Sequence, residues 1–204
     1  MEEIYATMSK EAYRVGRQRN VGDFEVDSRF TDDNSTVYFN PKTKQAAIAF
    51  RGTNPKKGSD LGADALIGLG LTRFSNRFKR AHEKTEAVMK HYGDSVVLTG
   101  HSLGGTQSLS AAKKHGLEAH AFNPGFSPIA PTKVSKRSKV YHVVGDPISS
   151  AVSYGWKSLK KNFKWRKPKG SDPHAIGNFI HKDITRPSLG IMKPPPRTLP
   201  LQYV

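Results

Sequence analysis

The chain has 204 residues, of which 36% are hydrophobic and 9% aromatic, enough for a globular fold with a buried core. It contains no cysteine, which excludes disulfides, thiolate metal sites and a cysteine nucleophile. Lys and Arg number 33 against 17 Asp and Glu, a formal net charge of +16, and residues 101–204 carry 17 of these basic and only 4 of these acidic side chains. This asymmetry favours an anionic partner (a phospholipid surface, nucleic acid or an acidic protein) over a merely solubilising basic surface.

The chain shows no apolar run as long as a membrane span and no charged-then-apolar leader. We therefore expect no transmembrane segment and no signal peptide. The expected protein is soluble, and the compartments to consider are the interior of a cell and a virion. The sequence leaves the oligomeric state open.

Residues 1–20 are predicted to form a packing helix, because apolar residues recur near helical spacing from Ile4 to Val15 and Gly16 lies close to its end. Residues 37–39 and 45–51 are predicted to be two strands, joined by a turn at 40–44 that is rich in turn-forming residues.

Residues 54–75 are polar and turn-prone at first, then apolar and punctuated by glycine. Two interpretations stay open for them: a flexible lid or acyl-chain wall over a binding site, and a helix packed on the sheet. From Phe74 to Val88, apolar residues recur every three to four positions, which predicts an amphipathic core helix that ends before Gly93.

Residues 95–112 contain the strongest chemical signal. A β-branched apolar run, residues 96–98, predicts a buried strand, and a small-residue segment after Gly105 predicts a helix. Between them lies Gly100-His101-Ser102-Leu103-Gly104, a G-x-S-x-G pattern. A sharp strand-to-helix turn would project the Ser102 hydroxyl from the sheet, and glycines on either side would prevent collisions in that turn. The alternative is a glycine-rich turn with an idle serine. Residues 119–122 and 140–144 are predicted to be further strands.

The segment VVLTGHSLGG, together with Ala49–Thr53 and Val144–Pro147, resembles the class 3 lipases of the α/β-hydrolase superfamily, above all the compact lipase-like proteins of some viral genomes. The resemblance implies a compact α/β-hydrolase fold, with a mostly parallel central sheet flanked by helices and an antiparallel N-terminal hairpin. We expect one such domain over residues 1–186 and a Pro-rich C-terminal tail over residues 187–204.

The resemblance also implies an oxyanion hole made by the backbone amides of Thr53 and Leu103. An ordinary loop residue that bonds its neighbours is the alternative for Thr53.

A serine nucleophile needs a base that is oriented by an acid, and in α/β-hydrolases the chain order is serine, acid, histidine. Asp146, at a strand end, matches the acid position of the family, with Asp172 as the alternative. His174 matches the histidine segment and is preferred to His181 as the base. His101 is expected to support the turn, whereas the strand residues His120 and His142 are expected to be packed or surface residues. No metal-ligand or phosphate-cradling pattern is present, so we expect no metal and no cofactor.

Residues 156–169 form a basic aromatic stretch with seven basic and no acidic side chains. Because the chain must travel here from acid to base, we expect a loop that borders the active-site mouth. Contact with an anionic membrane is the preferred role, and nucleic acid, an acidic partner or a plain solvated loop are the alternatives. The residues proposed for anion binding are Trp156, Lys157, Lys160, Lys161, Lys164, Trp165, Arg166 and Lys167.

The predicted function is hydrolysis of a lipid ester, with phospholipid slightly favoured by the basic stretch. Two other functions stay open: a non-enzymatic basic binding module on a hydrolase fold, and a soluble short-chain esterase.

Overall fold

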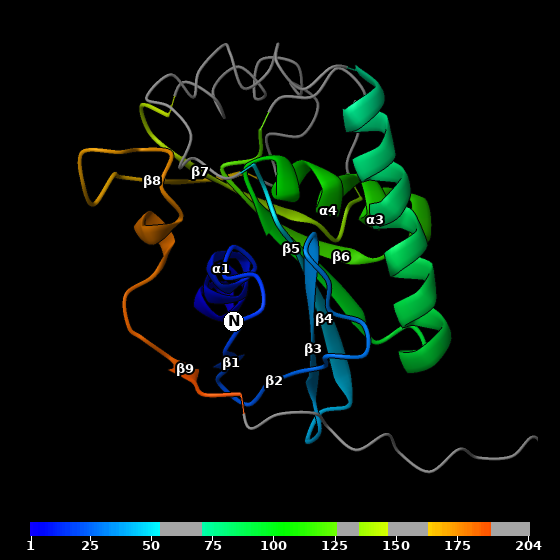
Figure 1. Cartoon of the computed structure of the whole chain (residues 1–204). Helices are drawn as coiled ribbons and strands as arrows, with labels where there is room; N and C mark the ends of the chain where they lie inside the picture. Colours follow the sequence, from blue (N-terminus) through cyan, green and yellow to red (C-terminus); the bar gives the residue numbers. More distant parts are fainter. Residues whose placement is uncertain (54–70, 126–134, 147–162, 189–204) are drawn as a thin grey trace, which may run out of the picture.

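The computed structural model describes residues 1–53, 71–125, 135–146 and 163–188 (Figure 1). Its centre is a seven-stranded sheet with the strand order β2-β3-β4-β5-β6-β7-β8. β2 (Glu25–Val26), β3 (Ser35–Asn40) and β4 (Gln45–Phe50) pair antiparallel. From β4 onward every pair is parallel, through β5 (Val96–His101), β6 (Glu118–Phe122), β7 (Lys139–Val143) and β8 (Phe163–Arg166).

Helices cover both faces of this sheet (Figure 1). α3 (Leu71–Tyr92) and α4 (Leu103–His115) connect successive parallel strands and lie on one face, whereas α1 (Glu2–Glu11) lies on the other. Side chains alternate between the two faces of a strand, so each strand contributes residues to the hydrophobic core on either face of the sheet. In β5, Leu98 packs with the α3 and α4 residues and Val97 packs with the α1 residues. The predicted α/β-hydrolase fold, with its antiparallel hairpin β3–β4, is confirmed.

The turn between β3 and β4 forms as its composition predicts. The side chain of Asn40 accepts hydrogen bonds from the backbone amides of Lys42 (3.0 Å) and Thr43 (3.2 Å). Lys44 adopts a φ of 59°, in the left-handed region that closes a tight turn. The predicted core helix is also present as α3, and its residues Phe78 and Val88 are buried.

Two predicted boundaries are wrong. The first helix ends at Glu11 rather than near residue 20. The buried carboxylate of Glu11 accepts hydrogen bonds from Arg19, so the chain after the helix folds back to bring Arg19 beside Glu11. The following strand β1 (Asn20–Val21) pairs with β9 (Thr185–Arg186). In addition, residues 163–166 are not loop but the edge strand β8, so the alternation of aromatic and basic residues there is strand periodicity.

The part of the chain that was expected to form a lid lies mostly outside the described residues, since α3 already begins at Leu71. The expected tail is described only as far as Ser188. None of the helices in the described ranges is long and apolar enough to cross a membrane.

Candidate active site

Ser102 lies at a strained turn between β5 and α4. Its φ of 56° and ψ of −130° fall outside the regions that L-residues favour, and such strain is typical of functional turns. The geometry requires glycine on both sides. A Cβ on Gly100 would overlap the backbone of Gly104, and a Cβ on Gly104 would overlap the carbonyl group of Phe50. The close approach of β5, α4 and the end of β4 therefore explains the G-x-S-x-G spacing.

The residues expected to form the oxyanion hole lie at this turn. Leu103 is the first residue of α4, where backbone amides have no partner within the helix. Thr53 follows Gly52, and a Cβ on Gly52 would lie 3.3 Å from the Cβ of Ser102. The two segments that carry the proposed amides are thus adjacent, and their roles stay a prediction.

Gly125 is a site residue to which the sequence alone assigns no specific role, although it belongs to a segment that follows a predicted strand, where ligands gather in open α/β sheets. A Cβ at this position would lie 3.1 Å from the Leu103 amide nitrogen and 3.5 Å from the Ser102 hydroxyl oxygen. The carbonyl group of Gly125 also accepts a hydrogen bond from the Thr106 hydroxyl (2.5 Å). Glycine therefore leaves room beside the serine hydroxyl, and the signal for this part of the site is the position of residues 123–125 after the parallel strand β6.

Asp146 and His174 form a direct pair. Asp146 is completely buried at the end of β7, and its Oδ2 lies 2.9 Å from Nδ1 of His174. A carboxylate in this position accepts the Nδ1 proton, so Nε2 is left as the acceptor for a proton from a nucleophile. Ser102 Oγ makes no hydrogen bond to His174 or to any other described residue; such contacts often tighten only when substrate binds.

The two alternatives for the triad have other partners. Asp172 Oδ1 accepts a hydrogen bond from the backbone amide of His174 (2.9 Å), so this carboxylate stabilises the loop conformation and does not orient the His174 imidazole. The backbone amide of His181 donates to the carboxylate of Glu3 in α1, and His181 is exposed. Asp146 and His174 remain the proposed pair, and the structure brings them together.

Two asparagines hold the His174 loop. Asn123 donates to the carbonyl oxygens of Pro173 (2.9 Å) and His174 (3.2 Å), and Asn178 donates to the carbonyl oxygen of Asp172 (2.9 Å). Asn123 follows β6 with a φ of 40° and also accepts the amide of Val143 in β7 (2.9 Å). These side chains fix the loop against the carboxyl ends of the strands.

His101 joins the serine turn to the same loop. Burial lowers the pKa of His101 to about 3, so this imidazole is neutral near pH 7. Nε2 of His101 lies 2.7 Å from the carbonyl oxygen of His174, which can only accept a hydrogen bond, so the His101 proton is on Nε2. Nδ1 is then an acceptor, and it receives the proton of the Tyr13 hydroxyl at 3.1 Å. His101 thus connects residues on either side of the expected site, in addition to its place in the turn.

The basic aromatic stretch is described only in part, since Trp156, Lys157, Lys160 and Lys161 lie outside the described residues. In β8, Trp165 stacks on His142 with ring centroids 5.0 Å apart and is 48% exposed. Lys164 lies over the Tyr141 ring, and Arg166 forms an ion pair with Glu2 (3.0 Å). Trp165 therefore points to the sheet face opposite to that of Lys164 and Arg166. Lys167 is exposed after the strand.

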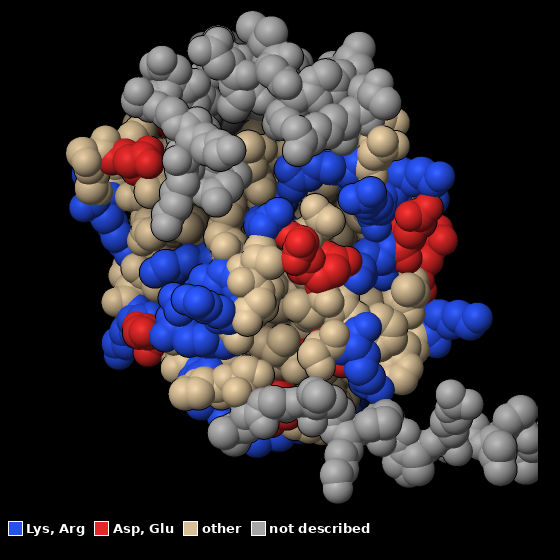
Figure 2. All heavy atoms as spheres, viewed as in Figure 1, with Lys and Arg blue, Asp and Glu red and all other residues tan. Residues whose placement is uncertain are grey.

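Basic side chains are not confined to this strand. Figure 2 shows Lys and Arg spread over the visible face of the molecule, with acidic side chains in separate groups among them. Among the residues in the described ranges, no three histidine or carboxylate side chains gather as they would around a metal ion.

A mostly parallel sheet between helical layers, with a strained serine at the turn from β5 to α4, is the architecture of the lipase-like α/β hydrolases, which are ester hydrolases. A family model described as a Tle-like phospholipase domain matches residues 6–150. Because this match spans more than two-thirds of the chain, the chain belongs to that phospholipase-like family.

Several solved structures are similar to this chain. Lip2 lipase from Yarrowia lipolytica has 19% sequence identity and a TM-score of 0.46, over 72% of each chain. A triacylglycerol lipase from Penicillium expansum has 18% identity and a TM-score of 0.47, over 91% of this chain and 89% of that one. A carboxylesterase from Mesorhizobium loti has 16% identity and a TM-score of 0.44, over 61% of this chain and 67% of that one. A comparison with curated proteins finds no match.

Proposed function

We propose that the protein is a serine hydrolase that cleaves carboxylic esters of lipids, of the phospholipase A type, through Ser102, His174 and Asp146. The observation that carries this proposal is the strained serine at the β5–α4 turn, next to a loop whose histidine is paired with a buried aspartate. The motifs around Ser102, Arg51 and Asp146 support a class 3 lipase type within the hydrolases.

The proposed reaction has two steps. Ser102 Oγ attacks the ester carbonyl carbon while His174 Nε2 takes the hydroxyl proton, and Asp146 stabilises the imidazolium that forms. The amides of Thr53 and Leu103 donate hydrogen bonds to the oxyanion. His174 then returns the proton to the leaving alcohol, which departs and leaves an acyl-enzyme. In the second step His174 activates water, which attacks the acyl carbon and releases the fatty acid and free Ser102.

The substrate class rests on two observations. The family to which the chain belongs is described as phospholipase-like, and a net charge of +16 favours anionic lipid surfaces. Trp165 and Lys167 are exposed on or beside the edge strand β8, close in the chain to His174. We propose that the basic aromatic stretch contacts an anionic membrane, while its first half lies outside the described residues.

The membrane contact has its own test. Changing Lys157, Lys160, Lys161 and Lys164 to Glu should weaken binding to anionic vesicles and spare hydrolysis of p-nitrophenyl butyrate. Unchanged vesicle binding would rule out this role. Arg166 is left intact because it pairs with Glu2 and supports the fold.

The hydrolase proposal is tested by assaying p-nitrophenyl butyrate and anionic phospholipid vesicles with the wild type and Ser102→Ala. Ser110→Ala, a half-buried serine on the helix α4 that follows Ser102, is the matched control. Turnover that is lost in Ser102→Ala and kept in Ser110→Ala supports the assignment, and the vesicle-to-butyrate ratio separates a lipase from a short-chain esterase. Full turnover in Ser102→Ala would refute it. No turnover by the wild type would favour a non-enzymatic binding module instead.

A further inference from the structure

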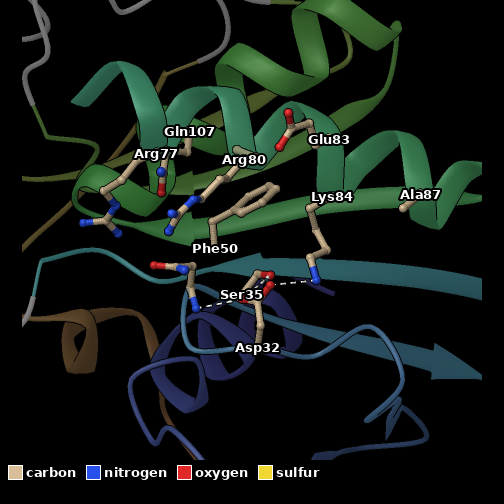
Figure 3. Close-up of a pocket in the computed structure, with 11 residues that line it drawn as sticks. Asp32, Ser35, Phe50, Arg77, Arg80, Glu83, Lys84, Ala87 and Gln107 are labelled. Carbon is tan, nitrogen blue, oxygen red and sulfur yellow. Dashed lines mark hydrogen bonds and ion pairs between the residues drawn. The ribbon is translucent and has the colours of Figure 1, made fainter. Parts of the chain in front are cut away.

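The N-terminal part of α3 contacts both segments that carry the proposed oxyanion donors. Arg77 hydrogen-bonds to the chain that follows β4, where Thr53 lies, and the next residue, Phe78, packs against Leu103. Phe78 and Leu103 are buried together, at 5% and 4% exposure. Figure 3 shows Arg77 projecting from α3 toward the end of β4, with Arg80 on the same side of the helix. One helix therefore supports two segments that are far apart in the sequence.

Arg77 bridges two successive carbonyl groups. Its Nη2 donates to the carbonyl oxygen of Arg51 and, at 3.5 Å, to that of Gly52. These oxygens belong to the peptide units on either side of the Gly52 α-carbon, so a donor that contacts both restricts rotation about the φ and ψ of Gly52. The effect needs only these donated hydrogen bonds, and other contacts of the guanidinium would leave it unchanged.

The restraint acts at the most flexible point of this segment. Glycine is required at position 52, because a Cβ there would overlap the Tyr13 hydroxyl and the carbonyl oxygen of His101. Glycine also has more backbone freedom than any other residue, so the peptide unit between Gly52 and Thr53 needs an outside contact to fix its direction. The carbonyl and amide of a trans peptide point in opposite directions. Holding the Gly52 carbonyl group toward Arg77 consequently directs the Thr53 amide away from it.

We propose that Arg77 is a positioning residue of the oxyanion hole, which fixes the direction of the Thr53 amide by bridging the carbonyl groups of Arg51 and Gly52. The inference rests on the proposed serine hydrolase function, in which this amide donates to the oxyanion. Such a donor is effective because it is oriented before the negative charge develops, and a donor that must first rotate loses this advantage. Arg77 acts through Thr53 and needs no contact with the substrate.

The first test is steady-state hydrolysis of p-nitrophenyl butyrate by the wild type, Arg77→Met and Arg80→Met. Methionine keeps an unbranched apolar side chain and removes the donors. Arg77→Met should lower kcat by about 100-fold, the cost of misplacing a group that acts in the transition state, and change KM by less than about threefold. Arg80→Met is the matched control and should keep the wild-type kcat, since no hydrogen bond between described residues joins Arg80 to residues 51–53.

A boronic acid inhibitor reports on the oxyanion hole itself. With butylboronic acid, Ser102 Oγ bonds to boron and its proton passes to His174, so the tetrahedral boronate carries a negative charge as the oxyanion does. Arg77→Met should weaken this inhibition by about tenfold or more, because the adduct resembles the transition state. Urea unfolding establishes that each variant is folded. If Arg77→Met does not fold, Arg77→Lys takes its place; it keeps a donor on a shorter side chain, and kcat should fall by about tenfold.

The possible failures can be told apart. A wild-type kcat or an unchanged boronate affinity in folded Arg77→Met would overturn the inference and leave the proposed function intact. An equal loss in Arg80→Met would also overturn it, because the charge of α3 rather than the bridge would then be responsible. A wild type without ester hydrolysis, or full turnover in Ser102→Ala, would overturn the proposed function and this inference with it.

Discussion

Acidification from pH 7 to pH 5 should destabilise the fold strongly, because three histidines are buried in neutral form. Burial lowers the pKa of His101 to about 3, and lowers the pKa values of His120 and His142 to about 4, from an ordinary value of 6.5. In the unfolded chain all three regain the ordinary value. Between pH 6.5 and about 4 the unfolded state therefore binds more protons than the folded state, and the stability falls as the pH falls.

The size of the effect follows from these shifts. Each histidine costs ~2 kcal/mol of unfolding free energy between pH 7 and pH 5. Three such groups together remove ~5–6 kcal/mol, which is comparable to the whole stability of many domains. Urea unfolding of the wild type at the two pH values measures this loss, and the slope near pH 5 should correspond to an uptake of about three protons on unfolding.

Variants separate these histidines from other acid effects. His120→Gln cannot titrate, so its loss of stability over the same interval should be smaller than that of the wild type by ~2 kcal/mol. His181→Gln, at an exposed position, is the control and should leave the pH dependence unchanged. A pH dependence that is the same in the wild type and His120→Gln would refute the reasoning for that residue. A wild-type slope below one proton would refute it for all three.

Three further predictions concern the proposed active site. Asp146→Asn should keep the fold and lower kcat on p-nitrophenyl butyrate by about 10⁴-fold, because an amide holds the wrong tautomer of His174; a kcat within tenfold of the wild type would exclude Asp146 as the acid. Gly104→Ala should lower the free energy of unfolding, measured in urea, by ~4 kcal/mol or more, since its Cβ overlaps the Phe50 carbonyl group. Gly116→Ala, with a φ of 70° and open space around it, should lower it by only ~1–2 kcal/mol. Equal losses in the two variants would contradict the packing argument. Tyr13→Phe should cost ~1–3 kcal/mol, because Nδ1 of His101 loses its donor; unchanged urea unfolding would show that this hydrogen bond contributes nothing.

The sequence predicted the parts of the fold whose signals are local. Three local signals place β5, the turn and α4 without knowledge of the rest of the chain. They are the apolar run at residues 96–98, which favours a strand, the flanking glycines, which allow the turn, and the small residues after Gly105, which favour a helix. The same holds for α3, whose apolar residues recur every three to four positions from Phe74 to Val88.

The parts that could not be predicted depend on distant partners. Helix α1 ends early because Arg19 finds the carboxylate of Glu11, and β1 exists because Asn20 and Val21 pair with residues more than 160 positions later. Likewise, the phenolic proton of Tyr13 matters only because His101 lies opposite it. No local sequence pattern predicts such long-range pairings.

The contacts that join the first and last described segments have a consequence for biosynthesis. Glu3 accepts the amides of His181 and Lys182, and β1 pairs with β9, so the loop of the proposed base is held by residues that precede its contacts by more than 160 positions. These contacts close only when residue 186 has emerged, long after the serine turn is complete. Such long-range closure is slow compared with the formation of local elements. A nascent chain on the ribosome would therefore carry the proposed nucleophile without a positioned base, and the proposed ester hydrolysis would begin only after β9 has docked.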